Sequence, residues 1–132
     1  MVKNYFYLIV GLLLLLFAGT QTLNGLQAVL PILHGSNIDS STITNFTYQW
    51  HIISAEQLVF GVALIAIAFQ RNREKVKIVA WIVMAILFVR GIIIVAVNIS
   101  LGISNITNFL TSTIALFALV VLLLLGTKVK DK

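Results

Sequence analysis

Two ionisable side chains, Glu56 and Arg90, lie inside segments that are otherwise strongly apolar. A charged group near the centre of a bilayer costs about 2.5 kcal/mol or more, so such groups face a protein interior, find a partner or line a pathway. If the two helices meet the outer membrane surface at Trp50 and Ile99, Glu56 lies roughly 9 Å deep and Arg90 roughly 13 Å deep. The long Arg90 side chain can reach outward, and we predict an intramembrane ion pair between the two residues. A pair that only joins two helices stays open as an alternative.

Uncharged polar residues are predicted at the same depth as this pair. The inner halves of three of the predicted helices are apolar, over residues 8–18, 58–69 and 114–125. This asymmetry predicts an outward-facing polar pocket above an apolar plug, which is typical of a binding site rather than of a continuous pore. An alternative explanation is that helix ends are polar because they meet water. It accounts for Asn98 but for neither Glu56 nor Arg90. The candidate ligand-binding residues are Gln21, Asn24, His51, Glu56, Gln57, Arg90 and Asn98.

Membrane-spanning helices must position these residues. The chain has 132 residues, of which 60% are hydrophobic and only 10% are charged, whereas a soluble domain is about 45–50% apolar and about 25% charged. Its apolar runs are continuous, without the alternation of a β-barrel, and indicate helices of about 20 residues. We predict an all-α polytopic membrane four-helix bundle, a single membrane domain over residues 1–132. Helices are expected at about 5–30, ended by Pro31, and at 50–69, 76–99 and 107–126, with an outer loop at 31–49 and a cytoplasmic loop at 70–75.

The basic residues predict the orientation of these helices. Lys3, the segment 70–77 and the C-terminal tail hold eight of the nine Lys and Arg residues, while the 31–49 loop and the 100–106 turn hold none. Because cytoplasmic loops carry the excess of Lys and Arg, we expect a multi-pass protein of the cell membrane with both termini cytoplasmic. The first segment also resembles a signal peptide cleaved near Thr20. Gln21, Asn24 and Gln27, spaced three apart beyond that point, form a polar stripe that favours a retained helix.

No arrangement typical of catalysis or metal binding is found. His51 and Glu56 are about 140° apart around a helix, so they do not share a face, and we predict no catalytic residue. His34, His51 and Asp39, in a chain without cysteine, make a poor zinc site, and we predict no metal site. The basic run at 70–77 is what the orientation requires, so no nucleic-acid partner is expected.

Small residues recur at a spacing that permits close helix packing. Ser54, Gly61 and Ala68 lie seven positions apart, as do Gly91 and Asn98. Such faces are predicted to form the seams of the bundle. The helix predicted at 107–126 has no polar residue from 114 to 125 and is expected to face lipid or a second protomer.

The segment 54–64, SAEQLVFGVAL, resembles the second helix of the DoxX-like group of small four-helix membrane proteins, in which a glutamate is followed by a glycine and an apolar run. The size of the chain and its number of predicted helices agree with that group. The glycine-rich first helix expected there is replaced by a leucine run. The resemblance implies an accessory role beside membrane redox or quinone-linked systems.

These observations favour a membrane protein that binds a small amphiphilic or lipid-like ligand, as an accessory subunit of a membrane system. The main alternative is a dimeric ion- or proton-coupled transporter that uses Glu56, although a nearby Arg90 would hold that carboxylate ionised. A lipid-modifying enzyme using His51 and Glu56, and a purely structural or interaction role, stay open. The expected partners are membrane lipid, the amphiphilic ligand, and a second copy or another membrane protein; no cofactor is identified.

Overall fold

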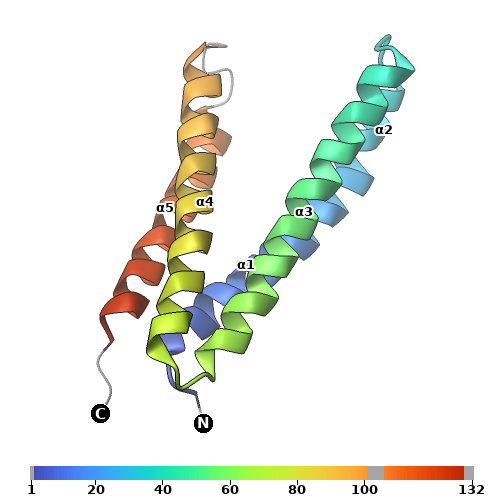
Figure 1. Ribbon diagram of the computed structural model, residues 1–132. Helices are drawn as coiled ribbons and strands as arrows, with labels where there is room; N and C mark the ends of the chain where they lie inside the picture. The colour runs from blue at the N-terminus through green and yellow to red at the C-terminus, as the bar shows by residue number, and fades with distance from the viewer. Residues whose placement is uncertain (1, 101–105, 130–132) are drawn as a thin grey trace. The chain divides into compact units, whose positions relative to one another are not determined.

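The regular structure of the described chain is entirely helical. A computed structural model describes residues 2–100 and 106–129. Four segments in this range are long and apolar enough to cross a membrane, Tyr5–His34, Ser40–Ala68, Glu74–Ser100 and Leu110–Lys128. This confirms the all-helical fold and the four candidate spans, and it agrees with a four-helix bundle of a multi-pass membrane protein. In chain order the helices are α1 (Tyr5–Asn24), the π-helix η1 (Gly25–Val29), α2 (Leu30–His34), α3 (Ser40–Ala68), α4 (Arg73–Ser100) and α5 (Ile106–Lys128) (Figure 1).

Pro31 does not end the first membrane helix, contrary to the prediction. The helical segment continues through η1 and α2 to His34 as one candidate span of 30 residues. The five residues of η1 are wound as a π-helix, and the Leu30 N–H donates to the Gly25 carbonyl. Pro31 then falls in the first turn of α2. A π-turn is one way in which a membrane helix accommodates a proline, which has no N–H to donate.

The predicted outer loop over residues 31–49 is also wrong, because only residues 35–39 lack helical structure. The Asp39 carboxylate caps α3, accepting hydrogen bonds from the Thr42 N–H at 2.8 Å and the Thr42 hydroxyl at 2.6 Å. Hydropathy did not indicate that this helix begins at Ser40, because most of residues 40–49 are polar although they are helical. The ends of α4 and α5 lie within three residues of the predicted positions, the start of α4 at 73 rather than 76 being the largest difference.

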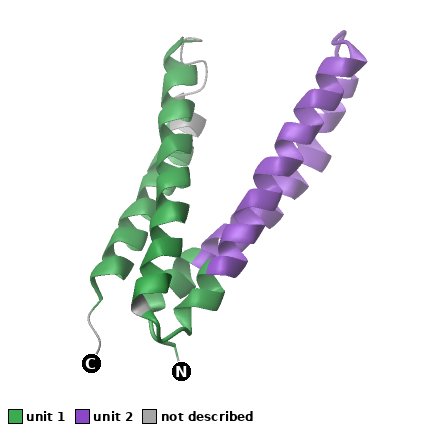
Figure 2. Ribbon diagram, in the orientation of Figure 1, with its two compact units in different colours: residues 1–10, 64–132 green, residues 11–63 purple. Residues whose placement is uncertain are grey.

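The residues form two compact units, Gly11–Ala63 and Met1–Val10 with Leu64–Lys132 (Figure 2). We call them the hairpin unit and the basal unit. The hairpin unit holds most of α1, together with η1, α2 and most of α3. The basal unit holds the start of α1, the end of α3, and α4 and α5. The single membrane domain over residues 1–132 stays a prediction.

Small residues make the helix contact of the hairpin unit. Gly11 and Gly61 are both buried, and a Cβ atom added at Gly61 would lie 2.9 Å from the Gly11 carbonyl oxygen and 2.8 Å from Leu15. Ala18, seven residues after Gly11, and Ser54, seven before Gly61, are buried as well. The seven-residue spacing keeps small residues on one face of each helix, so the two backbones approach closely. Ser54, Gly61 and Ala68 are all buried, as expected for this face of α3, and their role as a seam of the whole bundle stays a prediction.

The basal unit is built on α4 and α5, which lie side by side (Figure 1). Leu87 of α4 and Leu123 of α5 are almost completely buried. At Gly91 a Cβ atom would lie 3.0 Å from Leu116, so the glycine leaves room for that leucine. The start of α1 and the end of α3 meet at one end of this unit, where the Lys3 and Asn4 N–H groups donate to the Ala68 carbonyl at 2.8 and 3.1 Å.

Candidate intramembrane polar site

Helix α3 places Gln57 on its buried face. Ser54, Gln57 and Gly61 follow one another at spacings of three and four residues, which is one side of an α-helix. Ser54 is only 6% exposed, and its hydroxyl donates to the Trp50 carbonyl one turn earlier at 3.2 Å. The Gln57 side-chain oxygen Oε1 is buried and has no hydrogen-bond partner in the part of the chain that the structure describes.

An unpartnered amide oxygen in this setting is unusual. Buried polar atoms are nearly always hydrogen-bonded, and leaving one unpaired costs about 1–3 kcal/mol. The core of a bilayer contains no water that could supply the missing donor. Gln57 Oε1 is therefore an acceptor that can take a hydroxyl or N–H group from outside the described chain.

Glu56 occupies the next position on α3 and is half-buried. Its carboxylate is the acidic group nearest in sequence to Gln57, and it lies in the candidate span Ser40–Ala68. His51, five residues earlier, is exposed. Across residues 2–100 and 106–129, no group of three or more His, Asp or Glu side chains is arranged to hold a metal ion.

Helix α1 accepts a hydrogen bond from α3 through a main-chain carbonyl. Gln21 is half-buried, and its main-chain carbonyl accepts a hydrogen bond of 2.8 Å from the Trp50 indole N–H. The indole also lies against Gly25, where any Cβ atom would overlap it. Asn24 is exposed. Sequence reasoning missed the contact of Trp50 with Gly25; the available signals were an indole N–H that needs a partner and a glycine seven residues after Ala18.

Arg90 and Asn98 belong to the basal unit, on α4, and both are half-buried. The Asn98 side-chain amide donates to the Ile94 carbonyl one turn earlier at 2.8 Å, so one of its donors is used within its own helix. The structure thus places Gln21, Asn24, His51, Glu56 and Gln57 in the hairpin unit. The ion pair of Glu56 with Arg90 stays a prediction. The predicted 100–106 turn and the tail lysines 130 and 132 lie largely outside the described residues.

Comparisons with known proteins give no relative for this chain: no protein-family model, no curated protein and no solved structure matches it. The likeness of residues 54–64 to the DoxX-like group therefore stays a resemblance of one helix.

Proposed function

We propose that the protein binds a small amphiphilic or lipid-like ligand at an intramembrane polar site centred on Glu56 and Gln57. The observation that carries this proposal is the buried Gln57 Oε1, an acceptor without a donor in the described chain. A ligand head that carries a hydroxyl or N–H group satisfies this atom, while a hydrocarbon tail lies against the apolar part of the helices.

The other candidate residues extend the site. Glu56 favours a ligand head that donates hydrogen bonds or carries a positive charge. Gln21, Asn24 and His51, which lie in the same unit as Glu56 and Gln57, add amide and imidazole groups. The resemblance of residues 54–64 to the DoxX-like group supports an accessory role beside a membrane system.

The proposed orientation has both termini in the cytoplasm, in a multi-pass protein of the cell membrane. Support comes from the basal unit, where the segment before α1, the α3–α4 connection and the end of α5 meet at one end. Lys3, Arg71, Lys75, Lys77 and Lys128 are all at these helix ends. A common excess of positive charge on one side is the pattern of cytoplasmic segments.

Native mass spectrometry of the full chain, released from mild detergent, tests the ligand proposal. Gln57→Leu replaces the amide, with its unpartnered oxygen, by an apolar side chain of similar size. Thermal stability is therefore expected to be unchanged or higher. The same substitution is expected to remove a small molecule that the wild-type protein carries. Glu56→Gln is expected to weaken retention of that molecule as well.

Thr22→Val is the matched control. Its hydroxyl donates to the Ala18 carbonyl within α1 at 2.9 Å, so the polar group is already satisfied and its loss leaves ligand retention unchanged. A wild-type protein that carries no defined small molecule, or a folded Gln57→Leu variant that keeps it, contradicts the proposal. Proton flux into liposomes that depends on Glu56 would instead favour the transporter alternative.

A further inference from the structure

Four helix ends meet at one end of the basal unit. The Ala68 carbonyl at the end of α3 accepts hydrogen bonds from Lys3 and Asn4, just before α1. The Asn4 side-chain amide donates to the Gly126 carbonyl near the end of α5 at 2.8 Å. Residues at the start of α4 reach the same place, because Val76 and Lys77 line a cavity together with Asn4 and Gly126.

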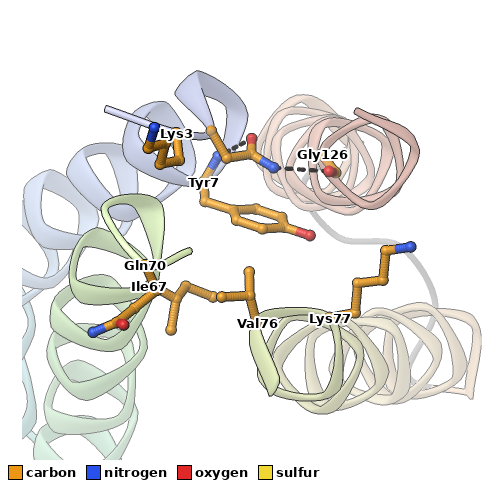
Figure 3. A pocket seen from close by; sticks show the side chains of 8 residues that line it. Lys3, Tyr7, Ile67, Gln70, Val76, Lys77 and Gly126 are labelled. Atoms are coloured by element: carbon orange, nitrogen blue, oxygen red, sulfur yellow. Dashed lines mark hydrogen bonds between the residues drawn. The ribbon is translucent and has the colours of Figure 1, made fainter. Parts of the chain in front are cut away.

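This cavity has an apolar floor and a basic rim. Tyr7, Ile67 and Val76 supply ring and aliphatic surface, and Lys3 and Lys77 lie on opposite sides of the Tyr7 ring in the view of Figure 3. Tyr7 and Val76 are buried, whereas both lysines are exposed. The cavity volume of about 20 Å³ has room for a water molecule and no more. A larger anion would therefore sit at the rim, where the exposed side chains of Lys3 and Lys77 can reach it.

The described residues that line the rim supply positive charge only. Among the described residues, two lysines and no carboxylate line the cavity. In the described part of the chain, no Asp or Glu forms an ion pair with Lys3 or Lys77. Glu74, the nearest acidic residue in sequence to Lys77, is exposed and is not part of the lining. Two lysines that come from distant segments and line one cavity favour an anion as its neighbour.

An exposed apolar surface of α4 begins directly beside the rim. Trp81 lies one helical turn after Lys77 on the same face of α4, and it is 54% exposed. Ile78 and Ile82 beside it are exposed by 60% and 55%. An exposed tryptophan one turn from a lysine is typical of the headgroup level of a membrane, with hydrocarbon beyond it. An occupant of this site therefore has a charged group and an apolar chain.

We propose that Lys3 and Lys77 hold the phosphate of an anionic phospholipid at this rim, with its acyl chains along Ile78, Trp81 and Ile82. The apolar surface next to the lysines favours a lipid phosphate over free phosphate. Basic pockets between membrane helices are a known setting for anionic headgroups. The inference does not depend on the proposed function at Glu56 and Gln57, which concerns the hairpin unit.

The test uses the full chain, delipidated in mild detergent and titrated with dioleoylphosphatidylglycerol, with binding followed by native mass spectrometry. Lys3→Gln and Lys77→Gln are each expected to weaken binding about five-fold, and the double variant about 25-fold. Lys77→Arg keeps the charge and is expected to bind as the wild type does. Both substituted side chains are exposed, so the variants are expected to fold, which circular dichroism verifies.

Lys75→Gln is the matched control, since Lys75 is an exposed lysine of α4 that does not line the cavity. If Lys75→Gln weakens binding as much as Lys77→Gln, the lipid senses overall charge and the site is disproved. Equal binding of dioleoylphosphatidylcholine, whose headgroup has no net charge, disproves the anionic preference. Displacement of the lipid by inorganic phosphate at equal concentration would show that the rim takes the free anion, and would overturn the lipid assignment.

Discussion

Asn4 and Gly126, 122 positions apart in the chain, are joined by a hydrogen bond of 2.8 Å from the asparagine side-chain amide to the glycine carbonyl. The other side-chain atom, Oδ1, accepts hydrogen bonds from the Phe6 and Tyr7 N–H groups at 3.1 and 3.3 Å and so caps α1. One buried side chain therefore begins the first helix and ties it to the last. Gly126 permits this approach, because a Cβ atom there would lie 2.5 Å from the Tyr7 ring.

Replacing Asn4 is expected to destabilise the protein in two separable steps. Asn4→Ser keeps a capping oxygen but is too short to reach Gly126, so it loses about 1–3 kcal/mol from the unpaired carbonyl. Asn4→Ala loses the cap as well, about 1 kcal/mol more. Thermal unfolding in mild detergent, followed by circular dichroism, measures both. Equal stability of the serine variant and the wild type would show that the bond to Gly126 contributes nothing.

Gly61 and Gly19 form a matched pair of helical glycines with opposite surroundings. Alanine at Gly61 places a methyl group 2.9 Å from the Gly11 carbonyl oxygen, so the two backbones must separate, at a cost of about 1–3 kcal/mol. Alanine at Gly19 meets nothing within 4 Å, and its higher helix propensity adds up to about 1 kcal/mol of stability. Unfolding curves of the two variants are thus expected to shift in opposite directions. A shift in the same direction would contradict close packing at Gly61.

The contact of Trp50 with α1 predicts a spectroscopic change. Gly25→Ala forces the indole away from its place against η1 and breaks its hydrogen bond to the Gln21 carbonyl. In a Trp81→Phe background, where Trp50 is the remaining tryptophan, its emission is expected to shift when Gly25 is replaced. Gly19→Ala in the same background serves as the control and is expected to leave the emission unchanged. An unaltered spectrum for Gly25→Ala would rule out the contact.

Asp39 predicts a pH-dependent start of α3. The hydrogen bonds from the Thr42 hydroxyl and the Thr42 N–H stabilise the carboxylate and lower the pKa of Asp39 below its ordinary value of 3.8. Because the pKa is lower in the folded state, the capping contribution is complete above pH 3.8 and is lost as the pH falls through the lowered pKa. The Thr42 amide resonance is expected to titrate with a midpoint below 3.8 in the wild type. Asp39→Asn is the control, because asparagine keeps a capping oxygen that does not titrate. A midpoint of the Thr42 amide resonance at or above 3.8 in the wild type would contradict the capping geometry.

Part of the candidate site could be predicted from residue types alone. The intramembrane position of Glu56 and its neighbour Gln57 follows from one polar pair inside an apolar run, because the bilayer makes any polar group there exceptional. The hydrogen bond from the Trp50 indole to the Gln21 carbonyl could not be predicted. Both depend on which residues of α1 and α3 face each other, and that register is a property of two helices in contact.

By itself, the sequence determined the four apolar segments, the connections and termini that carry the positive charge, and the small residues on the buried face of α3. These features are local, since hydrocarbon thickness sets the length of a span and side-chain size sets how closely helices pack. Only the tertiary structure decided that the first span continues past Pro31, that Asn4 reaches Gly126, that Gln57 Oε1 is buried without a donor, and that Lys3 and Lys77 share one cavity. Each of these depends on backbone hydrogen bonding or on a partner far away in the chain, which no local pattern of residues encodes.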